Sequence, residues 1–226
     1  MWAIIKKEVK SYFLSPIGYI FIGLFLAMCS IFFYIDIIGY GSTNFEYLFY
    51  SVSTILTFVV PILTMRMFAE ERKSGTEQLL ITSPRSITSI VLGKFISAVI
   101  IVLITELFTF LYFGILLYFG QPQLVTALVT MFGFLLLAMA YISFGMFASS
   151  LTENQIIAGV ITIGFFILTW FIPSLSQTLA PFSLINMFDK FPSGVIALDE
   201  LVTYISFTVL FIVLTIIVLQ RRKTVK

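Results

Sequence analysis

The sequence of 226 residues has no histidine and a single cysteine, and only 11% of its residues are charged. Without histidine, the commonest general base and nitrogen ligand for metals is missing. Cys29 has no second cysteine with which to form an intrachain disulfide. The scattered acids show no metal-ligand spacing, and no base stands beside a serine. We therefore expect no metal site, no catalytic residues and no cofactor bound by this chain.

A phosphate-binding loop is also missing. The dipeptide Gly93-Lys94 matches the end of that motif, but Thr88 replaces its first glycine and Phe95 replaces its Ser or Thr. The net charge is only +2, and the bases follow the topology of a membrane protein, which argues against nucleic-acid binding. The sequence thus predicts neither an ATPase nor a nucleic-acid partner.

Apolar residues dominate instead: they make up 60% of the chain, aromatic residues make up 17%, and the mean hydropathy is +1.10. These values lie outside the range of soluble globular proteins. Six apolar runs are each long enough to cross the lipid bilayer as a helix, which takes about 20 residues. They lie at about 17–38, 45–68, 87–118, 124–149, 154–172 and 200–220. The sequence predicts an all-α integral membrane protein with six transmembrane helices in one transmembrane domain, 1–226.

The basic residues indicate the orientation of these spans. Twelve of the thirteen Lys and Arg residues precede the first span, surround the loop between spans two and three, or end the chain. Six spans place all three groups on one side of the membrane, and only Lys190 falls on the other. Because Lys and Arg are enriched in cytoplasmic loops, we expect a multi-pass protein of the bacterial inner membrane with both termini cytoplasmic.

The first fourteen residues, MWAIIKKEVKSYFL, have the pattern of an amphipathic helix. Trp2, Ile5, Val9 and Phe13 recur at spacings of three and four, with the lysines on another face. We expect a helix that lies in the membrane interface and ends before Pro16. The apolar run that follows is long enough to span, so we expect this N-terminus to be retained and not cleaved as a signal peptide.

Residues 173–199 are apolar in patches but are interrupted by Pro173, Pro181 and Pro192. The segment is too broken to cross the membrane twice. We expect short re-entrant helices in the outer leaflet before the last span, where protein must bury any non-helical backbone. A folded outer loop is the alternative.

A charged stretch, AEERKSGTEQLLITSP at 69–84, separates the second and third spans. Ser74 and Glu77 have the spacing of a capping box, and Pro84 ends the apolar run at 79–81. The pattern predicts a short amphipathic helix on the cytoplasmic side. Because so short a helix is marginal alone in water, we expect it to dock onto a partner. The alternative is an ordinary polar loop.

The turn between spans four and five, SLTEN at 150–154, repeats the capping-box spacing at its first and fourth residues. It is either a second coupling loop on the cytoplasmic side or a tight turn. Just before it, Gly145 and Ser149 are small residues four apart, a spacing that allows close helix approach. The candidate contact residues of the turn are Thr152, Glu153 and Asn154.

Glu106 is the one ionisable residue deep inside a predicted span. Twelve residues separate it from Lys94, which places it about 18 Å from the inner interface, near the middle of the bilayer. A charged carboxylate there is costly, so we expect Glu106 to be neutral or paired and to face protein. It is a candidate intramembrane polar site, on a substrate path or at a dimer contact, or else a neutral acid hydrogen-bonded to a neighbouring helix.

Three segments carry a family resemblance. Residues 65–94, MRMFAEERKSGTEQLLITSPRSITSIVLGK, resemble the region between the second and third spans of type-2 ABC exporter permeases (ABC-2 type). Together with this region, two further segments resemble the gliding-motility-associated permease group: SPIGYIF at 15–21 and FASSLTENQIIA at 147–158. In one respect the chain departs from the pattern. The family's acid usually lies two residues after the threonine, whereas here Glu77 follows Thr76 directly and Gln78 takes the acid position.

The resemblance implies a permease subunit without a nucleotide site, driven by separate ABC ATPase subunits that bind ATP and Mg²⁺. It also implies pairing with a second copy or a related permease, and an accessory membrane protein as in the gliding-associated group. In such families the short helix between spans two and three, the coupling helix, sits in a cleft of the ATPase. The matching coupling residues here are Glu70, Glu71, Arg72, Lys73, Gly75, Thr76, Glu77, Gln78, Leu79 and Leu80.

The sequence thus favours the membrane-spanning permease of an ATP-driven exporter. A non-transporting scaffold that passes ATPase-driven motion to an extracytoplasmic partner is the alternative. A secondary carrier fits less well, because its spans should carry paired charges or broken helices at mid-membrane, and only Glu106 lies there.

Overall fold

The computed structural model describes residues 1–39, 41, 44–78, 85–175 and 183–225. Throughout these ranges the chain is helical and contains no strand. The elements are α1 (Trp2–Leu14), α2 (Pro16–Phe32), a π-helix η1 (Phe33–Gly39), α3 (Glu46–Thr64), α4 (Ala69–Lys73), α6 (Ile87–Phe119), α7 (Leu124–Leu151), α8 (Gln155–Leu175), α9 (Leu184–Met187), a 3₁₀-helix η3 (Phe188–Ser193) and α10 (Leu198–Val225).

The six predicted spans are confirmed as long apolar helices. The structure has six stretches that are long and apolar enough to cross a membrane, and the second of them runs through α3 and α4 as far as Lys73. Several helix ends differ from the prediction by a few residues; α8 continues through Pro173 to Leu175, and α10 extends to Val225. The bounds of the six stretches are Pro16–Asp36, Glu46–Lys73, Ile87–Tyr118, Leu124–Leu151, Gln155–Pro173 and Leu198–Lys223.

The core of the bundle lies around α3, α6 and α7. In these three helices more than half of the apolar window is buried, against less than a third in α2, α8 and α10. Aromatic side chains fill much of the interior: Tyr141 stacks on Phe166 at 3.7 Å between ring centroids, and Phe144 stacks on Phe165 at 3.8 Å. The many phenylalanines of the sequence therefore serve packing between helices, and others face the surroundings.

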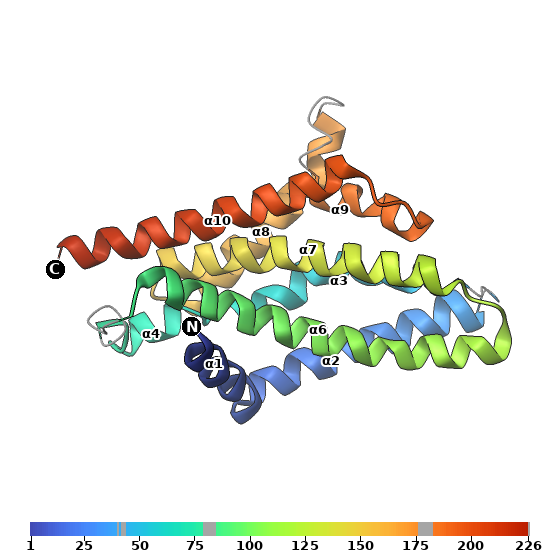
Figure 1. Ribbon diagram of the computed structural model, residues 1–226, viewed down its shortest axis with the longest axis horizontal. Helices are drawn as coiled ribbons and strands as arrows, with labels where there is room; N and C mark the ends of the chain where they lie inside the picture. The colour runs from blue at the N-terminus through green and yellow to red at the C-terminus, as the bar shows by residue number, and fades with distance from the viewer. Residues whose placement is uncertain (40, 42–43, 79–84, 176–182, 226) are drawn as a thin grey trace.

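Both chain ends and α4 lie at the same end of the molecule, on the left in Figure 1. α1 is steeply inclined to the long helices and packs against α6 and α2. Ser15, in extended conformation, separates α1 from α2, and Pro16 is the first residue of α2. The predicted stop before Pro16 is confirmed, because a proline disfavours helical geometry in the residue before it and suits the first helical position.

Two small residues allow close helix crossings near this end. A Cβ on Gly145 of α7 would lie 2.2 Å from Thr64 Oγ1 of α3, so only glycine fits there. A Cβ on Gly93 of α6 would lie 2.7 Å from Ile4 Cγ2 of α1. The Gly145 spacing was a weak signal in the sequence, and the close approach that it allows is present in the structure.

The segment before the last span contains two short helices, α9 and η3. Leu184, Phe188 and Phe191 are buried at 1% exposure or less, so the segment packs into the bundle. Thr130 of α7 donates a hydrogen bond to the Phe191 carbonyl at 3.2 Å, and Tyr204 of α10 donates one to the Leu184 carbonyl at 2.6 Å. Pro181 lies outside the described residues. The predicted short helices are present as α9, which ends at Met187, and η3, which follows it directly.

Candidate functional site

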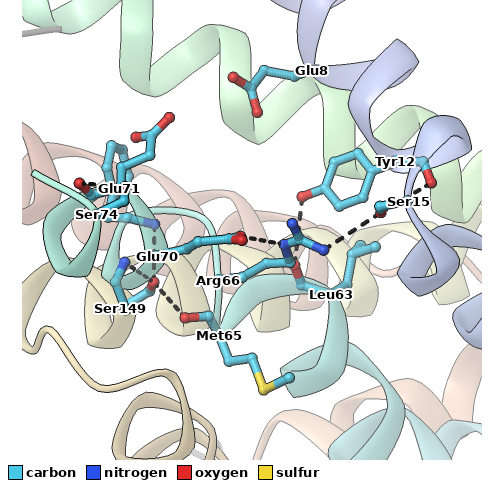
Figure 2. Close-up of polar contacts among 12 residues, drawn as sticks. Glu8, Tyr12, Ser15, Leu63, Met65, Arg66, Glu70, Glu71, Ser74 and Ser149 are labelled. Atoms are coloured by element: carbon cyan, nitrogen blue, oxygen red, sulfur yellow. Dashed lines mark hydrogen bonds and ion pairs between the residues drawn. The ribbon is translucent and has the colours of Figure 1, made fainter. Parts of the chain in front are cut away.

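The second span is interrupted by a turn just before α4, and a side chain from another helix forms hydrogen bonds with the backbone of this turn. After α3 ends at Thr64, the backbone turns through four residues and resumes as α4. The Ser149 hydroxyl of α7 accepts the backbone N–H groups of Phe68 and Ala69, both at 3.1 Å, and donates to the Met65 carbonyl at 2.9 Å (Figure 2). Ser149 thus satisfies backbone groups that a helix end leaves unpaired.

A buried lysine joins α4 to α6 and α1. The Lys94 side chain is only 3% exposed, and its Nζ lies 2.8 Å from Glu71 Oε1 of α4 and 3.3 Å from Glu8 Oε2 of α1. Its charge also lies 5.4 Å from the centre of the Phe68 ring. A buried ammonium needs such partners, because desolvation of an unpaired charge costs several kcal/mol. We call Lys94, Glu71 and Glu8 the charge triad.

The charge triad explains the dipeptide Gly93-Lys94, which fails as a phosphate loop. Gly93 lets α1 approach α6 closely at Ile4, and Lys94 then binds an acid from α1 and an acid from α4. This role of Lys94 could not be predicted from the sequence. The sequence does show that Lys94 precedes eleven apolar or small residues, which hints that the lysine is buried. It does not show the partners of Lys94, because Glu8 and Glu71 are far away along the chain.

A second set of polar contacts holds α4 from the side of α1. Arg66 forms a 2.6 Å ion pair with Glu70 and donates to the Ser15 hydroxyl at 3.4 Å (Figure 2). Tyr12 donates to the Leu63 carbonyl at 3.5 Å. Burial, together with the negative charge of Glu8, raises the pKa of Tyr12, so the phenol stays protonated and remains a donor.

Two arginines tie the far side of α4 and the residues after it to the other helices. Arg72 forms a 2.9 Å ion pair with Glu153 and donates to the Leu151 carbonyl at 3.3 Å. Arg222, in the last turns of α10, forms a 3.0 Å ion pair with Glu77 and donates to the Ser150 carbonyl. Residues 69–78 thus contact α6 and the ends of α7 and α10 directly, and they are linked to α1 through Lys94 and Arg66.

Two pockets flank this segment. One, of about 290 Å³, lies between α1 and α4 beside the charge triad. The other, of about 550 Å³, lies between residues 72–78, the turn after α7 and the end of α10. Three arginines and two glutamates line the larger pocket, together with Gly75 and Gln78; these charged residues are Arg72, Arg221, Arg222, Glu77 and Glu153.

The predicted coupling residues divide into two groups in the structure. Glu70, Glu71, Arg72 and Glu77 form ion pairs with other parts of the chain. A second group, consisting of Lys73, Gly75, Thr76 and Gln78, is exposed. Leu79 and Leu80 lie outside the described residues.

The predicted capping box of Ser74 and Glu77 is wrong, and the same spacing at Ser150 and Glu153 does not form one either. Ser74 ends α4, where its hydroxyl donates to the Glu71 carbonyl at 3.2 Å and lies 2.9 Å from Thr76 Oγ1. Gly75 follows with φ of 74°, a left-handed turn that glycine adopts without strain. The Glu77 carboxylate is drawn instead to Arg222, a full charge that outcompetes a backbone N–H.

In the turn after α7, Ser150 is still helical and donates to the Phe147 carbonyl. Asn154 caps the start of α8, since its Oδ1 accepts the Ile156 N–H at 2.9 Å. Thr152 Oγ1 in turn accepts the Asn154 N–H at 3.1 Å. Glu153 pairs with Arg72, so of the predicted contact residues two shape the turn and one bridges to α4.

Glu106 is buried inside the bundle at 2% exposure, as the cost of a membrane carboxylate predicts. Its Oε1 has no hydrogen-bond partner among the described residues. Thr109 donates to the Glu106 backbone carbonyl at 2.6 Å and Thr105 donates to the Ile101 carbonyl at 2.7 Å, so both hydroxyls serve the helix backbone. A side chain so buried cannot form a contact with a second copy.

Comparison with known families gives the class of protein. The family described as ABC-2 family transporter protein matches residues 38–219, which is most of the chain. The chain belongs to the ABC-2 family of transporter membrane proteins, whose members are permease components of ABC transporters and lack the nucleotide-binding site. A search of curated proteins finds no match.

Proposed function

We propose that this chain is the permease subunit of an ATP-driven exporter in the bacterial inner membrane. It pairs with a second permease copy, and each copy binds an ATPase subunit that holds ATP and Mg²⁺. Both termini and α4 face the cytoplasm. The family membership, the six apolar helices and the gathering of the basic groups at one end support this proposal.

The observation that carries the proposal is the set of ion pairs around α4. Residues 69–78 connect through charged side chains to α1, α6, the turn after α7 and the end of α10. A push on this segment by a partner therefore reaches the ends of several helices at once. Such a rigidly linked lever suits the conversion of ATPase motion into movement of whole helices.

The two groups of coupling residues then have different roles. The paired residues Glu70, Glu71, Arg72 and Glu77 pass movement on within the permease. The exposed residues and the two leucines after them contact the ATPase; they are Lys73, Gly75, Thr76, Gln78, Leu79 and Leu80. Glu153 belongs to the first group, and Thr152 and Asn154 hold its turn in place as a second coupling loop.

Four finer assignments belong to the same proposal. α1 is an interfacial helix, and α9 with η3 are re-entrant helices of the outer leaflet. The segments at 15–21 and 147–158 support membership in the gliding-motility-associated group, with an accessory membrane protein in the complex. Glu106 is an internal polar site of the permease, away from the dimer contact.

The decisive experiment replaces both leucines by aspartate, Leu79→Asp with Leu80→Asp, in a permease produced together with its ATPase. Burial of two leucines contributes roughly 3–6 kcal/mol before association costs, so the variant should lose the ATPase or uncouple its ATP hydrolysis from transport. Co-purification and ATP turnover in reconstituted membranes are the two measurements.

The matched control is Leu79→Met with Leu80→Met, which keeps the side chains apolar and should retain both properties. The aspartate variant should still insert with the topology of the parent. If it binds the ATPase and transports like the parent, residues 74–84 are an ordinary polar loop and the proposed coupling role is wrong.

A further inference from the structure

A pocket of about 310 Å³ lies at the end of the bundle opposite α4, between the start of α3 and η3. Two carboxylates line it, from Glu46 of α3 and Asp189 of η3, and none of the described residues in its lining is basic. Two aromatic rings one helical turn apart, Tyr47 and Tyr50, complete its polar and aromatic wall together with Asn44. Volumes of this order hold small ligands in proteins.

The wall that carries Asp189 is held rigidly. Its neighbours Phe188 and Phe191 are fully buried, and Phe188 packs against Phe134 of α7 with 6.2 Å between ring centroids. A Cβ on Gly133 would lie 2.2 Å from the Phe191 ring, so α7 is shaped to receive that ring. The carboxylate therefore projects from a packed turn of helix and not from a free loop.

Glu46 is the residue that points to a ligand. The residue is only 9% exposed, and its carboxylate accepts from its own backbone N–H but forms no ion pair with the described residues. The neighbouring outer acids differ, because Asp36 accepts from Ser51 and Glu200 pairs with Lys190 at 2.6 Å. Glu46 therefore presents a carboxylate without a cation to the pocket from an otherwise buried residue, and such a group is stabilised by a positively charged partner.

The one base near the pocket is already engaged. Lys190 follows Asp189 directly but turns to α10, where its Nζ lies 2.6 Å from Glu200 and 3.4 Å from Asp199. It does not line the pocket. The charged side chains in the lining are therefore acids only, and the field inside favours a positively charged guest.

We propose that this pocket binds a small organic cation that carries an ammonium group. The carboxylates of Glu46 and Asp189 supply charge-assisted contacts, and the rings of Tyr47 and Tyr50 supply cation–π attraction, which suits ammonium groups. A divalent metal fits less well, because the described residues contain no group of three or more acids, cysteines or histidines. The inference does not depend on the proposed export function.

Equilibrium dialysis of labelled choline against the full-length permease in lipid nanodiscs tests the proposal without any ATPase. Choline should bind saturably, and its uncharged carbon isostere dimethylbutanol should not displace it. Glu46→Gln and Asp189→Asn should each weaken binding by about tenfold or more, because each removes a charge-assisted contact. Tyr47→Leu should weaken it by about threefold.

The matched control is Asp199→Asn, an exposed acid at the same end that lies outside the pocket and should leave choline binding unchanged. Asp189 is exposed, so its variant decides the matter if Glu46→Gln fails to fold. Absence of saturable choline binding, equal displacement by dimethylbutanol, or binding of Ca²⁺ in place of choline would each overturn the proposal. Unchanged affinity in Glu46→Gln would show that this acid only serves the start of α3.

Discussion

At the scale of single residues, the most consequential feature is that many of the charged residues near α4 form ion pairs within the chain. Lys94 is nearly inaccessible, yet it binds acids from two elements that lie far apart in sequence. Glu71 supplies one oxygen to this contact, and its other oxygen has no hydrogen-bond partner in the described chain. Because a buried ion pair stabilises only while both partners are present, the charge triad is sensitive to loss of any member.

Removal of the lysine charge should expose this sensitivity. Lys94→Met leaves Glu71 without its ion-pair partner and Glu8 with only the exposed Lys7 at 3.9 Å, and we expect it to lower the free energy of unfolding by about 3–5 kcal/mol. The triple variant Lys94→Met with Glu8→Gln and Glu71→Gln removes all three charges and should recover most of that loss. Unfolding in detergent, followed by the loss of helical circular dichroism, measures both.

The control for that experiment is Lys10→Met, an exposed lysine of α1. It should unfold like the parent protein, because an exposed charge contributes little to stability. Equal stability of Lys94→Met and the parent would mean that the three charges are solvated in the membrane-bound protein and do not link α1 to α4.

At the scale of elements, the helix ends near α4 are joined through two different devices. One is the cap that Ser149 of α7 provides for the start of α4. The other is the glycine contact at which α1 meets α6. Both hold short amphipathic pieces, α1 and α4, that would be marginal as isolated helices. Their order therefore comes from packing against the long helices and not from their own propensity.

Loss of the Ser149 hydroxyl should loosen α4 selectively. Ser149→Ala leaves two backbone N–H groups and one carbonyl without their partner, and we expect a cost of about 2 kcal/mol. Hydrogen exchange of the amides at 67–73 should accelerate while the rest of α7 stays protected. Ser143→Ala is the control on the same helix, because that buried hydroxyl donates only to the Ala140 carbonyl of its own helix. Equal exchange in both variants would contradict the capping role.

The contact between α1 and α6 makes a separate prediction. Gly93→Ala places a methyl group 2.7 Å from Ile4 Cγ2, so α1 must shift or Ile4 must change rotamer. We expect faster hydrogen exchange across α1, and recovery when Ile4→Ala is added. Gly114→Ala, on the same helix, has no atom within 4 Å of its new methyl group and should not affect α1. An undisturbed α1 in the Gly93→Ala protein would show that the contact is not needed for docking.

At the scale of the whole molecule, the sequence predicted the spans but not what joins them. Continuous apolar runs can only be helices in lipid, so all six were found within a few residues. The burial of Glu106 also followed from the membrane alone. The ion pair between Glu77 and Arg222 could not be predicted in this way, because Arg222 lies 145 residues further on and no local pattern connects the two. The capping-box prediction was wrong for the same reason: a distant charge outcompeted a near backbone group.

The orientation of this bundle remains to be measured, and the chain offers a clean way to do so. Its one cysteine, Cys29, is buried at 1% exposure, so the parent protein should not react with a membrane-impermeant maleimide. Single cysteines can then be placed at exposed residues of either end, Thr76 beside α4 and Gln121 between α6 and α7.

Since the bases of both termini and of the α4 region lie together, the positive-inside rule places Thr76 in the cytoplasm. In intact spheroplasts the maleimide should label Gln121→Cys and spare Thr76→Cys, and permeabilisation should expose Thr76→Cys to the reagent. A cysteine in place of Lys223 should behave like Thr76→Cys, because six spans return the chain to the side on which it began. Labelling of Thr76→Cys in intact spheroplasts would place α4 outside, out of reach of any cytoplasmic ATPase.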